Sequence, residues 1–487
     1  EAAAVFLAQL PLLSDPPMVP GLGRKVLPFP CLAQLAVRIY AQIGDLKFLT
    51  EIFAHIQETC LAWFDPSLDF DQDGLPEWAV LAQTGWNDHP TFNIFNPEHL
   101  ATRIATTESF ALGKMLVEEL DALQKIARIV GDQVTLEHAS ALQAKLTSQL
   151  EAMHTQFPEA SCWDRDSHQL TSQAVLFEGS IAELEHQSLH LAQAARINVK
   201  LLIGITAPKP TQVHILGESP DGKPIEETIP SAALSRLGEF LFFTTEQVYQ
   251  QIERISFPEL SDQTWLRIYV ADLTLRDIGW YLAYTPEEKL KISELTEGAK
   301  DEFNADEEDP PQSIFASSLY GLPNYEQKTE EAIKTGLVNP AWNSLVLRHL
   351  LEVGAKPEAV ELFTSLMRGA VQVLRKEHHL CEAYNSQDAL PLGKSNCLTG
   401  LLPLQIFLEL AGIKLLAPDR VQVAGDYPFP WRLILRYRGV EVVREGKNTT
   451  VTLPDGSVHH HYGSQPRMFF TQPSTESADN QVEDKDQ

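Results

Sequence analysis

The chain has 487 residues, of which 44% are hydrophobic and 21% charged, so it can bury a large core and is long enough for two or three domains. Its formal net charge of −28 repels phosphate backbones and anionic membrane surfaces, so we expect no nucleic acid partner. No apolar run approaches the ~20 residues of a membrane-spanning helix, so we also expect no membrane partner.

The cysteines are odd in number and widely scattered, with no CxxC pair and no histidine at zinc-ligand spacing, so we expect neither a disulfide framework nor a zinc site. They are Cys31, Cys60, Cys162, Cys381 and Cys397. This cysteine usage favours a cytoplasmic location. The chain begins Glu1-Ala-Ala-Ala-Val without an initiator Met, so we expect its natural N-terminus to be missing.

Two helical hairpins are predicted in the first part of the chain. Apolar residues recur at helical spacing over residues 34–60, with a turn at Gly44-Asp45, and again over 108–151, with a break near Gly131-Asp132.

The pattern then changes to short β-rich runs punctuated by Pro and Gly, which predicts an inserted β-sandwich-like domain over 196–285. Helices are expected again at 341–355, 357–376 and 402–412. Alternating segments over 419–470 predict a small sheet.

Repeated helical hairpins without βαβ alternation argue against Rossmann and TIM folds and favour a mainly α fold, an (α/α)6-type toroid that is possibly incomplete. The expected domains are toroid over 1–195, β insertion over 196–285, toroid over 286–415, β segment over 416–472 and a disordered acidic tail over 473–487.

The most informative segment is a loop dense in carboxylates and aromatic residues, Asp69-Phe-Asp-Gln-Asp-Gly-Leu-Pro-Glu-Trp, followed by Gln83-Thr-Gly-Trp-Asn-Asp-His-Pro. It resembles the DxDxDGLPEW…Q-[ST]-G-x-x-[DE]-x-P loop of α/α-toroid glycosidases around glycoside hydrolase family 63, which includes processing α-glucosidases and debranching amyloglucosidase relatives. Those relatives also carry an N-terminal β-sandwich and early toroid helices, which we do not expect within this sequence.

The resemblance implies that an acid in this loop protonates the glycosidic oxygen. Asn87 stands where relatives usually have an acid, and an amide cannot donate that proton. The acid is the next residue, so Asp88 is the candidate general acid, with Asp73 and Glu77 as weaker substitutes. The alternative is a turn loop whose acids serve only structure.

The same loop matches the first half of a calcium-binding loop through Asp69, Asp71, Asp73 and Gly74. Val80 stands at the twelfth position, where such a loop requires Glu. We therefore expect no cofactor and leave a structural calcium ion at the three aspartates as an open alternative.

A second segment, Glu382-Ala-Tyr followed by Gly393, resembles the E-x-Y…G segment that carries the catalytic base of the same enzymes. Glu382 takes that position and Tyr384 is its neighbour at the site. An inverting enzyme holds acid and base about 6.5 to 9.5 Å apart to admit a water molecule. The alternative for Glu382 is a solvated surface side chain.

Asn339-Pro-Ala-Trp-Asn-Ser-Leu resembles the helix start that supplies substrate contacts in these enzymes. It makes Trp342 a candidate for stacking on a sugar and Asn343 a candidate for bonding its hydroxyls. Trp78 and Trp86 are further stacking candidates. For each, a core or capping role is the alternative.

These observations predict a glycosidase with a carbohydrate substrate, which cleaves α-glucosides or related small glycosides with inversion. Two other functions stay open. One is a catalytically inactive carbohydrate-binding toroid, suggested by Asn87. The other is a retaining β-glucosidase of the bile-acid glucosylceramidase type, for which the two carboxyls lie about 5 to 5.5 Å apart.

Overall fold

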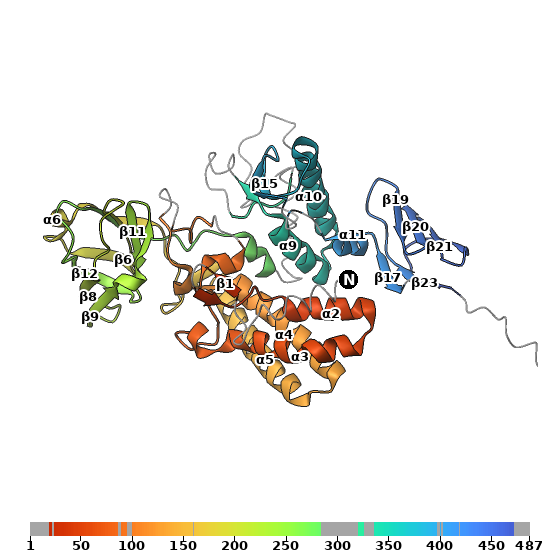
Figure 1. Ribbon diagram of the computed structural model, residues 1–487, viewed down its shortest axis with the longest axis horizontal. Helices are drawn as coiled ribbons and strands as arrows, with labels where there is room; N and C mark the ends of the chain where they lie inside the picture. The colour runs from red at the N-terminus through yellow and green to blue at the C-terminus, as the bar shows by residue number, and fades with distance from the viewer. Residues whose placement is uncertain are drawn as a thin grey trace, which may run out of the picture. The chain divides into compact units, whose positions relative to one another are not determined.

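The computed structural model describes residues 19–21, 24–85, 89–94, 100–158, 160–283, 320–325, 336–396, 400, 403–417 and 419–471. The chain divides into two compact units, Glu1–Tyr284 and Thr285–Gln487, and each is considered by itself (Figure 1). Within the described residues, no helix combines the length and the apolar character needed to cross a membrane.

The first unit opens with a helical subdomain in which helix α4 contacts its three neighbours (Figure 1). A short hairpin precedes the helices. The elements are β1 (Val19–Gly21), β2 (Arg24–Val26), α2 (Leu32–Ile43), α3 (Leu46–Leu61), α4 (Phe110–Val130) and α5 (Gln133–Gln156).

The two helical turns form where the sequence predicts them. Gly44 ends α2 with φ of 66°, a left-handed conformation that favours glycine, and Asp45 caps α3 by accepting from the backbone N–H of Lys47 at 2.9 Å. Gly131 and Asp132 repeat this arrangement between α4 and α5, with Asp132 bonding the N–H of Thr135. A C-terminal glycine followed by an N-capping aspartate therefore defines both hairpins.

Helix α2 receives its N-terminal cap from another helix. Glu119 on α4 accepts from the backbone N–H of Ala33 at 2.5 Å and of Gln34 at 3.3 Å, whereas Cys31 at the N-cap position makes no such bond. Glu119 is only 2% exposed, and this burial raises its pKa to about 7. A buried carboxyl thus joins the two helices.

A β-sandwich follows in the same unit. One sheet has the order β10-β11-β7-β13-β5 and the other β6-β12-β8-β9. The elements are β5 (Ala174–Ser180), α6 (Ile181–Leu184), β6 (Leu189–Ala195), β7 (Asn198–Leu202), β8 (Gln212–Glu218), β9 (Pro224–Pro230), β10 (Ser235–Leu237), β11 (Phe240–Thr244), β12 (Tyr249–Ser256) and β13 (Trp265–Val270).

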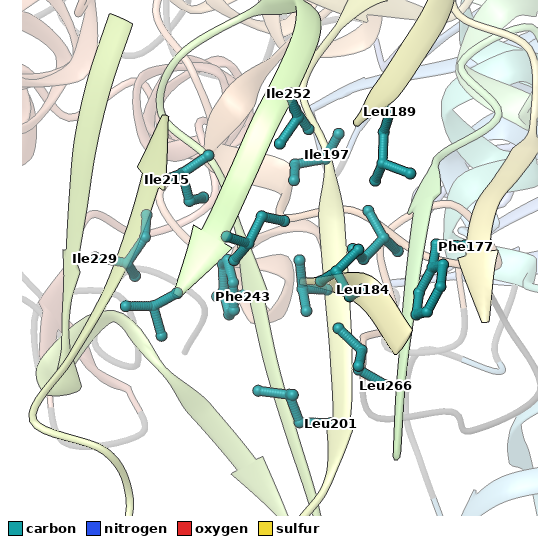
Figure 2. Close-up of a cluster of buried hydrophobic side chains, with 14 of the residues drawn as sticks. Phe177, Leu184, Leu189, Ile197, Leu201, Ile215, Ile229, Phe243, Ile252 and Leu266 are labelled. Atoms are coloured by element: carbon teal, nitrogen blue, oxygen red, sulfur yellow. The ribbon is translucent and has the colours of Figure 1, made fainter. Parts of the chain in front are cut away.

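Alternating side chains of the two sheets form one apolar core, which includes Leu201, Ile215, Ile252 and Leu266 (Figure 2). Strands β5 and β6 lie ahead of residue 196, where the sequence places the start of this domain. The sandwich therefore begins at Ala174.

The second unit joins helices to three antiparallel sheets, β14-β15-β16, β17-β18-β23 and β19-β20-β21-β22. The helices are α9 (Pro340–Glu352), α10 (Lys356–Glu377) and α11 (Leu404–Leu410). The strands are β14 (Leu337–Val338), β15 (Cys381–Asn385), β16 (Pro391–Ser395), β17 (Ile413–Ala417), β18 (Arg420–Val423), β19 (Leu433–Tyr437), β20 (Val440–Glu445), β21 (Asn448–Thr452), β22 (Val458–Tyr462) and β23 (Arg467–Phe470).

The fully buried Arg444 on β20 ties α11 to the last sheet. Its guanidinium donates to the carbonyl oxygens of Ala411 and Gly425 and to the hydroxyl of Thr449. The bond to Ala411, the C-cap residue of α11, satisfies a carbonyl at the helix C-terminus.

The expectation of a mainly α fold is corrected to a mixed one, because antiparallel sheets occupy both units. Strands β14, β15 and β16 lie inside 286–415, a range that the sequence assigns to helices. Strands this short present at most three side chains to each face, so their alternation is hard to recognise in the sequence.

Candidate functional site

The loop Asp69–Trp78 is shaped by its own acids. Glu77 donates its backbone N–H to the carbonyl of Leu68 at 2.7 Å, and its side-chain Oε1 accepts from the N–H of Phe70 at 3.2 Å. Asp73 accepts from the N–H of Leu75 at 2.7 Å. Gly74, with φ of 101°, provides the left-handed turn. The loop is therefore a closed structure rather than an extended connection.

Two acids of this loop meet two residues from distant positions in the sequence. One ligand atom from each of Asp71, Asp73, Glu108 and His168 lies within 4.8 Å of the others. The His168 Nε2 atom lies 3.0 Å from Oδ2 of Asp71, 3.5 Å from Oδ2 of Asp73 and 3.8 Å from Oε1 of Glu108. We call these four residues the acidic cluster.

Glu108 reaches the acidic cluster from strand β3 (Thr107–Ser109), which pairs with β4 (Cys162–Asp164) so that Glu108 faces Trp163. The indole N–H of Trp163 donates to Oε2 of Glu108. Glu108 is 1% exposed, and within the described residues no hydrogen-bond donor reaches its Oε1. A buried carboxylate oxygen of this kind needs a proton or a cation.

Burial changes the acidity of the cluster and of its neighbour. The pKa of Glu108 is raised to about 10, mainly because the carboxyl is buried and to a lesser extent because Asp73 and Asp71 lie nearby. Burial likewise raises the pKa of Asp73 to about 6 and that of Glu77 to about 8. Carboxyls gathered at such short range disfavour one another's ionisation unless a positive charge joins them.

The acidic cluster differs in its members from the three aspartates named in the sequence analysis. Asp71 and Asp73 belong to it, whereas Asp69 does not, although burial raises the pKa of Asp69 too. Glu108 adds a carboxylate from outside the loop. Glu108 and His168 were missed because no local spacing connects them to the loop.

The aromatic residue at the end of the loop is part of the core. Trp78 is 2% exposed and packs edge-on against Trp63, with ring centroids 5.6 Å apart, and stacks with Phe29 at 6.3 Å. Trp86, Asn87 and Asp88, which the sequence places at the site, lie outside the described residues.

His89, next to Asp88 in the sequence, is buried and firmly held. Its Nδ1 accepts from the backbone N–H of Thr91 at 3.1 Å, so Nδ1 carries no proton. Its Nε2 lies 3.2 Å from Oδ2 of Asp277 and donates the ring proton there. The chain that follows the candidate acid is thereby anchored.

In the second unit, Glu382 lies on strand β15, which contacts helix α10 (Figure 1). The side chain is half-buried. Its Oε2 accepts from the backbone N–H of Lys394 on β16 at 3.1 Å. Glu382 therefore lies on a strand and keeps partial access to solvent.

The other three candidates of this unit are buried. Asn343 is fully buried, and its side chain bonds the N–H and the carbonyl of Leu322 and the carbonyl of Asn339, each at 3.0 Å. The Tyr384 hydroxyl donates to the carbonyl of Tyr320 at 2.9 Å, and burial raises the pKa of Tyr384. Trp342 is 6% exposed. These side chains stabilise the surroundings of β15.

No protein-family model matches the chain, and no curated protein matches it. Among solved structures, the chain is similar to the GH63 mannosylglycerate hydrolase from Thermus thermophilus in complex with glucose. The identity is 10% and the TM-score 0.44, with 79% of this chain and 75% of that chain covered. An uncharacterized conserved protein from the same organism matches at 10% identity and a TM-score of 0.43, with 79% and 77% covered. A sialidase matches at 11% identity and a TM-score of 0.47, with 90% of this chain and 31% of that chain covered.

Proposed function

We propose that this chain is an inverting glycoside hydrolase that cleaves glucosidic bonds in α-glucosides or related small glycosides. The observation that carries the proposal is the hydrogen bonding of the Glu382 carboxylate. One carboxylate oxygen is held by a backbone N–H, while Oε1 has no hydrogen-bond partner among the described residues. A half-buried carboxylate arranged in this way is suited to take a proton from a water molecule as it attacks the sugar.

Asp88 is the proposed general acid, on the basis of its place in the loop sequence after Asn87. The two weaker substitutes are already engaged. Asp73 belongs to the acidic cluster, and Glu77 is 2% exposed and bonded to the backbone of Phe70. Their engagement favours Asp88 for the transfer of a proton to the leaving oxygen.

The acidic cluster is proposed to hold a structural calcium ion rather than to act on substrate. Hard carboxylate oxygens are the ligands that calcium prefers, and Asp71, Asp73 and Glu108 supply three of them. Bound there, the cation would join the Asp69–Trp78 loop to strand β3. It takes no part in the proposed proton transfers.

Among the proposed substrate contacts, the buried positions favour an indirect role. Trp78, Trp342, Asn343 and Tyr384 are each at most 6% exposed, so each stabilises the structure of its own unit. Trp86 stays the proposed stacking ring.

The experiment that tests this function is a screen of the purified protein against aryl and natural α- and β-glycosides, with NMR of the first anomer released. Inversion at an α-glucosidic bond supports the proposal. Retention favours the β-glucosidase of the bile-acid glucosylceramidase type. Binding of a sugar without hydrolysis favours the inactive carbohydrate-binding toroid.

A further inference from the structure

The two strands that surround Glu382 are not in regular register. Cys381 pairs with Ser395 and Ala383 pairs with Leu392, so the single residue Glu382 on β15 faces two residues on β16. Those two residues are Gly393 and Lys394. Two residues opposite one define a β-bulge, a device that redirects a side chain and is common beside active sites.

The first bulge residue is Gly393, and two observations favour glycine there. Its φ of 74° lies in the left-handed region that other residues rarely adopt. A Cβ atom added to it would also lie 2.9 Å from Oε2 and 3.0 Å from Cβ of Glu382. Any side chain at this position would therefore push against the glutamate.

The second bulge residue supplies the bond that orients the carboxylate. The backbone N–H of Lys394 donates to Oε2 of Glu382 at 3.1 Å. Because the bulge frees this N–H from the ladder, the bond goes to a side chain of the facing strand. It is the one hydrogen bond of the Glu382 side chain within the described residues, so it determines which oxygen stays open.

We propose that the Gly393–Lys394 bulge is the positioning element of Glu382. Gly393 leaves the space that the carboxylate occupies, and the Lys394 N–H fixes Oε2 so that Oε1 faces the reacting water. This inference rests on the proposed function, in which Glu382 is the general base. It adds two positioning residues that act through Glu382 and touch no substrate.

The test compares Gly393→Ala with the matched control Gly456→Ala. Gly456, in the turn between β21 and β22, has a φ of 84° and open space where a Cβ would be added. Both variants therefore carry left-handed backbone strain, but only Gly393→Ala crowds Glu382. We expect a kcat on the order of 100-fold lower for Gly393→Ala, with KM nearly unchanged, and nearly normal turnover for the control.

Gly393→Asn is the second variant, because Asn tolerates a left-handed backbone better than Ala while it places the same Cβ against Glu382. It keeps the test decisive if Gly393→Ala fails to fold. Wild-type kcat in a folded Gly393 variant would overturn the inference.

Crystal structures of the wild type and the folded variant separate this inference from the proposed function. We expect Glu382 to be displaced and its bond to Lys394 lost. An unmoved Glu382 would overturn the positioning role even if the enzyme is active. If the wild type cleaves no glycoside, the proposed function fails, and the structures alone decide whether the bulge sets the position of Glu382.

Discussion

The indole N–H of Trp163 donates to Oε2 of Glu108 across the β3–β4 pair, while Oε1 of Glu108 lies 3.8 Å from Nε2 of His168 in the acidic cluster. One oxygen of a buried carboxylate is thus satisfied by the protein, while the other lies among further acids. The arrangement resembles a cation site whose strand ligand is already fixed in place.

Calcium should therefore stabilise the protein through Glu108. Calcium at 100 times its Kd would add about 2.7 kcal/mol to the free energy of unfolding, which corresponds to a rise of several degrees in Tm. The Tm is measured in EDTA and in excess CaCl2 for the wild type, for Glu108→Gln and for the exposed control Glu137→Gln. We expect the calcium-induced rise in the wild type and the control but not in Glu108→Gln. Equal rises in all three would refute the role of Glu108.

Much of the local structure follows from short-range sequence signals. The glycine–aspartate pairs at Gly44 and Gly131 end one helix and cap the next, so both hairpins could be predicted from neighbouring residues. The partnership of Glu108 with the loop could not be, because it depends on pairing between β3 and β4, two short strands far apart in the chain.

The same limit applies to the candidate base. The sequence identifies Glu382 through resemblance, but its strand is short and its geometry depends on a bulge in β16. The residue types of Trp342 and Asn343 predict contacts with a sugar. In the structure both side chains are buried. The type of a residue indicates which groups its side chain can bind, whereas the packing of the fold determines which groups lie close enough to be bound.

Glu119 should make stability depend on pH. Its pKa is raised from 4.5 to about 7 in the folded protein, so between these values the folded state holds a proton that the unfolded state has lost. The unfolding free energy therefore falls as pH rises through this window, by about 3 kcal/mol in total. Chemical denaturation between pH 4.5 and 8 should show a flatter profile for Glu119→Gln. Parallel profiles for variant and wild type would contradict the assignment.

Asn343→Ala should act on stability rather than on substrate binding. The substitution leaves the N–H and carbonyl of Leu322 without their side-chain partner, at a cost of about 1 to 3 kcal/mol. Denaturant melts and KM for the best substrate measure the two effects. A large rise in KM with unchanged stability would instead favour a direct sugar contact.

Asp88→Asn should impair substrates with poor leaving groups far more than activated aryl glycosides, because a departing phenolate needs little protonation. Rates on an aryl glycoside and on the matching natural glycoside measure the difference. Equal losses on both would indicate a structural role.

The reciprocal variant Asn87→Asp tests whether Asn87 marks a lost acid. If it does, the variant gains activity on unactivated glycosides. We expect no gain.

The most direct test of the central claim is turnover by Glu382→Gln on the best substrate from the glycoside screen, beside the half-buried control Glu361→Gln on α10. An amide keeps the size of the side chain but cannot take a proton from water. We therefore expect turnover to fall between about 10²-fold and 10⁴-fold, with nearly unchanged Tm, and the control to stay active. A Glu382→Gln variant that keeps most of its turnover would contradict the assignment of Glu382 as the general base.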